Sequence, residues 1–179
     1  VVTATGTGGA ATSEAIQVTV FSAFEDDEAL QLLTGGSTKT WYWAAAESGH
    51  LGVGPNDGDP ANGNNFIPSF FAAAPNQIGA PCFYEDQLVF TLNDGEINYD
   101  LINNGQTFFN AAFSNGAGQD TCLEFNPGAT KTVTLLPSET YVPEDLKRGT
   151  LMSFSDNGFM SYFIDTSEYD ILSISENRM

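Results

Sequence analysis

The stretch that decides the fold is QLVFTLNDGEINYDLI, residues 87–102. It predicts two strands, Gln87–Leu92 and Glu96–Ile102, joined at the turn signal Asn93-Asp94-Gly95. The pattern of short strands and turn signals continues on both sides of it. The further strand candidates are Thr38–Ala44, Thr107–Phe113, Thr130–Leu135, Gly149–Ser155, Phe159–Ile164 and Tyr169–Ser175. Eight short strands without a helical repeat predict an all-β fold, an antiparallel, jelly-roll-like β-sandwich.

The charge of the chain excludes several classes of partner. Its 179 residues include 23 Asp and Glu against five scattered Lys and Arg, a formal net charge of -18. Nucleic acid and anionic membrane surfaces require clustered basic residues, so we expect neither as a partner. The same field favours a neutral carbohydrate over a polyanionic one. No stretch approaches the roughly 20 apolar residues of a membrane span, so no direct membrane insertion of this segment is predicted.

The two cysteines, Cys82 and Cys122, favour a disulfide. The count is even, and there is no CxxC pair that would point to zinc. Closing this loop would stabilise the fold by roughly 4 kcal/mol in the chain-entropy model. Two buried free thiols in a reducing compartment are the alternative.

Residues before the sandwich divide into two segments. Residues 1–22 predict two strands, Val1–Thr5 and Ala15–Phe21, around a glycine-rich turn. An isolated hairpin is marginally stable, so we expect it to belong to a sheet whose other strands lie outside the chain. Residues 23–37 predict a solvated linker with one helical turn, and residues 38–179 the sandwich.

The residues provide a weak case for catalysis, and no catalytic residue is predicted. His50 is the single histidine, and no nucleophile or metalloprotease motif is present. A glycosidase strand needs a series of carboxylates on one face. Glu168 and Asp170 begin such a series, but Leu172 and Ser173 stand where the next carboxylate is needed.

The long segment Gly49–Pro81, rich in Gly, Pro, Asn and Ala, predicts a functional loop. Asp57, Asp59 and Asn62 within it place hard oxygen ligands close together, which makes calcium a candidate. An Asx-rich turn is the alternative, and the sequence requires no cofactor.

Aromatic residues indicate a binding surface more clearly. In Trp41-Tyr42-Trp43 the two tryptophans share one strand face, which we expect to be buried, with Tyr42 nearer solvent; the reverse assignment remains open. Phe70 and Phe71 lie in the long loop, where they form either an exposed platform or a clamp over the sheet edge. Flat rings bury the C–H faces of neutral sugars.

Several motifs give the chain a family resemblance. They are LTGGSTKTWYW at 33–43, GHLGVGP at 49–55, PSFFAAAPN at 68–76, CFYED at 82–86, NNGQTF at 103–108 and SEYDILSI at 167–174. Together they resemble a domain of surface lipoproteins in bacterial Sus-type glycan-uptake systems, notably those for β-1,3-glucans such as laminarin. The domain follows PKD modules, and residues 1–22 resemble the last two strands of such an immunoglobulin-like module. It also accompanies family-sixteen laminarinases.

The resemblance implies a non-catalytic, lectin-like sandwich on the extracellular face of the outer membrane, lipid-anchored through another part of the protein. It would hold a neutral β-glucan beside a SusC/SusD-like importer complex. A structural or docking module and a family-sixteen-type glycoside hydrolase remnant are the alternatives. The chain departs from the family pattern at Phe70-Phe71, where a tryptophan pair is expected, and this puts affinity or ligand identity in doubt. The candidate glycan contacts are Phe70, Phe71, Trp43, Tyr42, His50 and Asn76.

Overall fold

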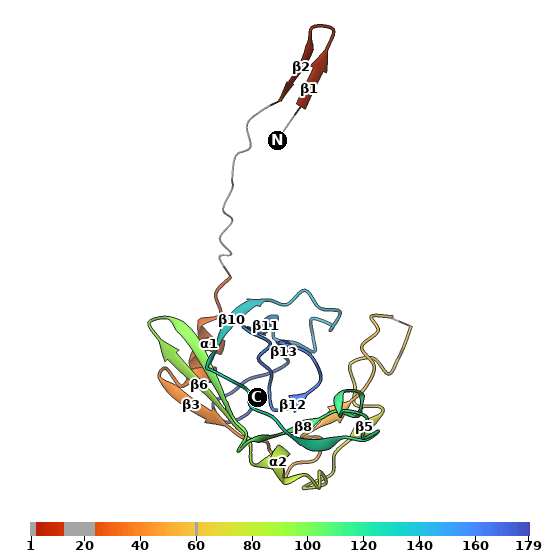
Figure 1. The fold of residues 1–179 in the computed structure, drawn as a ribbon, viewed down its shortest axis with the longest axis vertical. Coiled ribbons are helices and arrows are strands. Elements are labelled where there is room, and N and C mark those ends of the chain that lie inside the picture. The colour runs from red at the N-terminus through yellow and green to blue at the C-terminus, as the bar shows by residue number, and fades with distance from the viewer. Residues whose placement is uncertain (1–2, 13–23, 60) are drawn as a thin grey trace.

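The computed structural model describes residues 3–12, 24–59 and 61–179. Its main feature is a six-stranded antiparallel sheet in the order β13-β11-β10-β7-β6-β3 (Figure 1). The strands are β3 Thr38–Trp41, β6 Gln87–Asn93, β7 Glu96–Ile102, β10 Lys131–Pro137, β11 Thr150–Phe154 and β13 Glu168–Ile171. At the β6–β7 turn Asp94 and Gly95 both have positive φ, as a two-residue hairpin requires.

Smaller elements complete a sandwich-like, all-β fold. The strands are β4 Gly52–Val53, β5 Phe71–Ala72, β8 Gln106–Phe109, β9 Thr121–Glu124 and β12 Tyr162–Phe163, and the short helices are α2 Pro81–Tyr84 and a 3₁₀ turn, η1 Ala111–Phe113. β4 pairs with β5, and a three-stranded sheet has the order β12-β8-β9. The β12–β8 pair is parallel, an exception among the otherwise antiparallel strand pairs of the described residues.

The inner face of the large sheet forms the main hydrophobic core. Alternate residues of β7 point inward, and Tyr99 is almost fully buried between the rings of Phe90 and Phe154. Its hydroxyl donates to the backbone carbonyl of Phe159 at 2.9 Å, which satisfies the one polar atom of the buried ring. The buried residues beside the candidate site form a separate cluster, which includes Leu51, Phe83 and Phe108.

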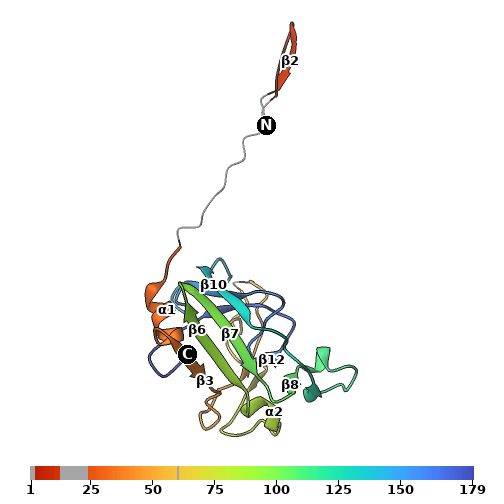
Figure 2. The ribbon, with the colours of Figure 1, turned by 60° about the vertical axis from the view of Figure 1, so that its left-hand side comes forward.

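The helix α1, Asp27–Thr34, corrects the prediction of a solvated linker. Ala29 and Leu33 are fully buried in the main core, and Trp41 Nε1 donates to the Leu33 carbonyl at 2.9 Å. Because their spacing of four residues places both on one helix face, eight residues suffice to seal one end of the sheet. Within residues 24–179, Figures 1 and 2 show α1 on the side away from α2 and β8.

Asp26 anchors this helix to the sheet. Its Oδ1 caps the helix by accepting from Ala29 N at 2.9 Å. Both carboxylate oxygens accept from Arg148, each at 2.8 Å, and Thr150 donates to Oδ2. The hydrogen bonds from Arg148, above all, hold the pKa of Asp26 well below its ordinary value.

The N-terminal hairpin differs in register from the prediction. β1 is Thr3–Gly6 and β2 is Gly9–Thr12, so the turn is Thr7-Gly8 and the partner strand begins directly after it. Gly9 adopts φ +118, a conformation that glycine permits at little cost. The expected second strand, Ala15–Phe21, lies outside the described residues.

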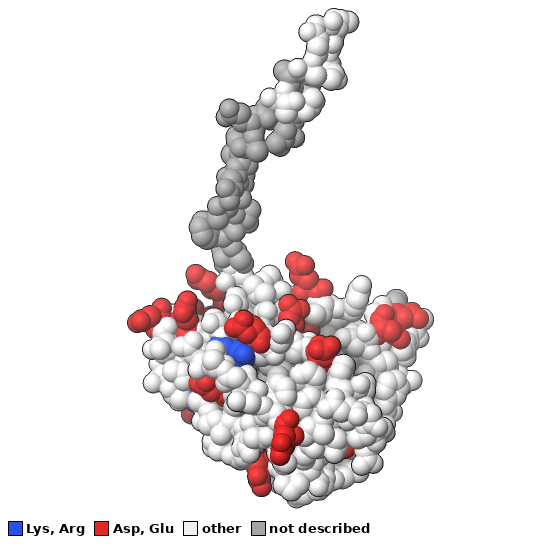
Figure 3. Space-filling view, viewed as in Figure 1, with Lys and Arg blue, Asp and Glu red and all other residues white. Residues whose placement is uncertain are grey.

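Figure 3 shows one face of the molecule, on which acidic side chains are scattered over a surface that is otherwise largely uncharged. Within the described part of the chain, no helix is both long and apolar enough to cross a bilayer.

Candidate functional site

An open groove with a volume of about 750 Å³ lies between the β4–β5 hairpin, the segment before α2, and the strands β8, β9 and β12. We call it the Phe70 groove. It is lined by Leu51, Val53, Phe70, Phe71, Gln77, Ile78, Gly79, Ala80, Pro81, Phe108, Asn110, Gln119, Asp120, Thr121, Cys122 and Tyr162. An open, mostly apolar groove with a few polar groups is typical of a ligand site.

The β4–β5 hairpin forms one wall of the groove, and two glycines allow its close packing. A Cβ on Gly54 would lie 1.8 Å from the carbonyl oxygen of Ile67, and one on Gly52 would lie 2.7 Å from Pro68 Cβ. The missing side chains therefore allow the two halves of the loop to approach closely. Val53 then pairs with Phe71, which fixes the position of the two phenylalanines.

Phenylalanine side chains provide the apolar surface. The Phe70 side chain is 72% exposed, and Phe71 is half-buried beside it. The floor includes Phe108 and Tyr162, whose ring centroids are 5.4 Å apart. The sequence left two interpretations open for these phenylalanines, an exposed platform and a clamp over the sheet edge. The exposed position of Phe70 agrees with the platform.

A hydrogen-bonded chain fixes the polar side of the groove. Asn110 Nδ2 donates to the Tyr162 hydroxyl at 2.7 Å, and that hydroxyl donates to Asp120 Oδ2 at 2.7 Å. The other Asp120 oxygen accepts from Ala111 N at 2.8 Å. Burial, more than its hydrogen bond to Asp120, raises the pKa of Tyr162 to about 12, so the phenol remains a donor at neutral pH.

Cys82 and Cys122, the pair for which the sequence favours a disulfide, are bonded in the structure. Cys82 belongs to α2 and Cys122 to β9, and Cys122 lines the groove. The bond therefore ties the α2 side of the groove to the β9 side and limits how far the two can separate.

A buried polar cluster lies behind the groove floor. Trp43 Nε1 donates to Ser161 Oγ at 2.9 Å, and Ser161 Oγ donates to Asp86 Oδ2 at 2.6 Å. Asp86 is fully buried, and its Oδ1 has no hydrogen-bond partner in the described part of the chain. Burial raises the pKa of Asp86 to about 7 because the charged form loses its hydration.

The other predicted glycan contacts lie outside the lining of the Phe70 groove. Tyr42 is 63% exposed, in agreement with its expected orientation, whereas Trp43 packs on Phe83 at 4.2 Å between ring centroids. His50 makes hydrogen bonds to Tyr84 and to a backbone carbonyl. Asn76 occupies a turn with φ 55. Of the six predicted contacts, only Phe70 and Phe71 therefore line this groove among the described residues.

The calcium candidates form a network of Asx turns. Asp57 accepts from Asp59 N and from Asn62 Nδ2, each at 2.9 Å, and Asp59 accepts from Ala61 N at 2.9 Å. The bond from Asp59 N contributes most to lowering the pKa of Asp57. Calcium binding here remains a prediction, and the ion would have to replace some of these donors.

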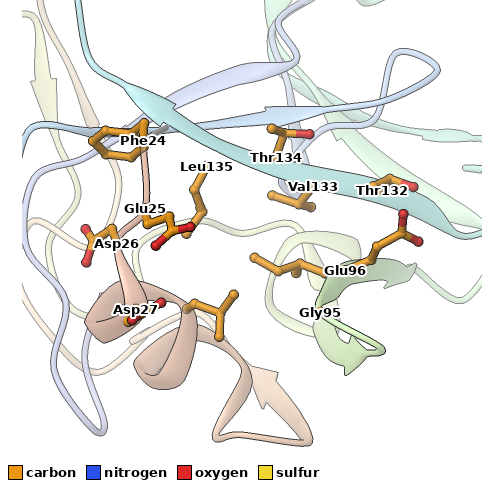
Figure 4. Close-up of a pocket in the computed structure, with 12 residues that line it drawn as sticks. Phe24, Glu25, Asp26, Asp27, Gly95, Glu96, Thr132, Val133, Thr134 and Leu135 are labelled. Carbon is orange, nitrogen blue, oxygen red and sulfur yellow. The ribbon is translucent and has the colours of Figure 1, made fainter. Parts of the chain in front are cut away.

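A second, smaller pocket of about 270 Å³ lies beside α1 (Figure 4). Its lining includes the acidic residues Glu25, Asp26, Asp27 and Glu96, together with Leu135. Asp26 already binds Arg148. Of the described residues that line this pocket, Phe24 is the one aromatic residue.

Sequence reasoning missed the three residues that form the hydrogen-bonded chain of the groove: Asn110, Asp120 and Tyr162. They come from three separate segments, and no local motif joins them. The proximity of Asp120 to Cys122 is the one signal in the sequence that could have drawn attention to it.

No protein-family model matches the chain, and no curated protein sequence shows significant similarity to it.

Proposed function

We propose that the chain is a non-catalytic module that holds a neutral β-glucan in the Phe70 groove. The observation that carries the proposal is the presence, in one open groove, of the exposed Phe70 ring and the polar side chains of Asn110, Gln119 and Asp120. The ring would cover the C–H face of a pyranose, and the polar groups would bond its hydroxyls. No Lys, Arg or His belongs to the described lining of the groove, which also favours an uncharged ligand.

The proposed location rests on the resemblance and has one independent support. Disulfides persist in oxidising compartments, and Cys82–Cys122 agrees with exposure on the cell surface. There the module would present glycan to a SusC/SusD-like importer complex.

Affinity electrophoresis with laminarin in the native gel tests the proposal. We expect the wild type to migrate more slowly than in a gel without glycan, and Phe70→Ala to lose most of this retardation. Truncating a central aromatic contact costs about 1–2 kcal/mol, roughly 5- to 30-fold in affinity. Tyr141→Ala is the matched control, because it removes an exposed aromatic ring outside the groove.

Unchanged migration of the wild type across a panel of neutral glucans would refute the proposal. The exposed Phe70 ring also favours the docking alternative, since such rings are common at protein interfaces. Co-purification of an importer subunit with the wild type but not with Phe70→Ala, without glycan binding, would support that alternative. Release of reducing sugar from laminarin would instead support the hydrolase alternative.

A further inference from the structure

We infer that Asp120 determines the ligand specificity of the Phe70 groove, by accepting hydrogen bonds from sugar hydroxyls and repelling anionic sugars. The inference rests on the proposed function and adds to it the residue that selects the class of glycan.

The position of the Asp120 carboxylate is set by two donors. Tyr162, which is only 8% exposed, donates its hydroxyl to Oδ2, and the backbone amide of Ala111 donates to Oδ1. Tyr162 is itself held by the Asn110 amide and by packing against Phe108. A residue placed in this way has little orientational freedom to lose when a ligand binds.

The hydrogen-bonding positions that remain free on the Asp120 carboxylate determine which ligand groups it can bind. A carboxylate offers about four lone-pair sites, and two of those on Asp120 are used by the donors above. Asp120 remains exposed on the groove side. A sugar hydroxyl can donate a hydrogen bond to such a site, whereas a carboxylate or sulfate group offers only acceptors.

The rest of the groove provides no charge that would offset this preference. Its described lining contains no basic side chain, so the negative charge of an anionic sugar would meet Asp120 without a compensating cation. The discrimination therefore has a local origin, in addition to the long-range field of the chain.

Two glucans that share a backbone test the inference: laminarin and carboxymethylated laminarin, titrated calorimetrically at about 0.15 M salt and again at 1 M. We expect the wild type to prefer laminarin by about tenfold or more at both salt concentrations, because contacts in the groove are screened less than the long-range field. Asp120→Asn should weaken laminarin binding by about three- to tenfold, since charge-assisted hydrogen bonds become neutral ones. It should also reduce the preference to about threefold or less.

Asp145→Asn is the matched control, because it removes the same charge from an exposed residue outside the groove lining. It should leave the preference unchanged. Tyr162 is a positioning residue, so Tyr162→Phe should lower the preference ratio while the thermal unfolding curve remains cooperative. A loss of stability alone would weaken the binding of both glucans equally.

The outcomes separate this inference from the proposed function. If the wild type binds neither glucan, the proposed function fails. If it binds laminarin and Asp120→Asn retains the full preference for it, the assignment of Asp120 is wrong and the glycan site stands.

Discussion

Replacement of Asp86 by asparagine should change how the stability of the protein depends on pH. The Asp86 carboxyl is fully buried, with one oxygen bonded to Ser161 and the other unpartnered within the described residues. Its pKa is about 7 in the folded protein and 3.8 for the unperturbed group. Because the folded state binds the proton more tightly, the contribution of Asp86 to stability is fully present below about pH 4 and is lost as pH rises to about 7.

The size of the effect follows from the difference between these two pKa values. About three pH units, at about 1.4 kcal/mol each, amount to roughly 4 kcal/mol of unfolding free energy. Asparagine keeps the acceptor for Ser161 and does not titrate, but it buries an additional N–H group at a cost of about 1–3 kcal/mol. We therefore expect Asp86→Asn to be less stable than the wild type at pH 4.5 and more stable at pH 8.

Urea unfolding of both proteins at one-unit pH intervals from 4.5 to 8.5 measures this difference. Other carboxylates titrate equally in the two proteins, so their effect cancels in the comparison. Free energies of unfolding that fall in parallel, without a crossing, would show that Asp86 does not hold a proton at neutral pH and would refute the reasoning.

Three further changes test the anchoring of the fold. Asp26→Ala removes a helix cap and the partner of a half-buried guanidinium, so urea unfolding should show a loss of about 2–4 kcal/mol at pH 7. The difference from wild type should shrink below about pH 4, because the lowered pKa of Asp26 contributes stability only where the unfolded group is ionised. Gly54→Ala places a Cβ 1.8 Å from a carbonyl oxygen, so thermal unfolding should show a loss of about 1–3 kcal/mol and laminarin retardation should disappear. Gly63→Ala is the control: its Cβ would meet open space, so both the stability and the laminarin retardation should be preserved. Replacing Cys82 and Cys122 together by serine should cost about 4 kcal/mol, and a melting temperature unaffected by reductant would contradict a structural role for the disulfide.

The central hairpin could be predicted from sequence almost to the residue. The expected strands Gln87–Leu92 and Glu96–Ile102 differ from β6 and β7 by a single residue. The information there is local, because the turn residues between the strands adopt the positive φ that Asp and Gly tolerate.

For residues 27–34 the sequence predicted helical structure but not its burial against the sheet, because the contacts that bury it are not local. An eight-residue helix is marginal by itself, and its stability comes from packing. Leu33 is buried because the large sheet lies beneath it, and Asp26 is held by Arg148, which follows more than one hundred residues later. The sequence of residues 27–34 gives no information about the large sheet or about Arg148.

The features of the candidate site likewise divide into those set by the local sequence and those set by the tertiary structure. The sequence by itself determined the β architecture, the acidic surface and the aromatic loop that carries Phe70, because turn chemistry, charge and side-chain type are properties of short segments. Only the tertiary structure decided that Phe70, Asp120 and Tyr162 line one groove while Trp43 packs on Phe83. That juxtaposition depends on which distant segments bury their apolar surface together, and no short segment specifies it.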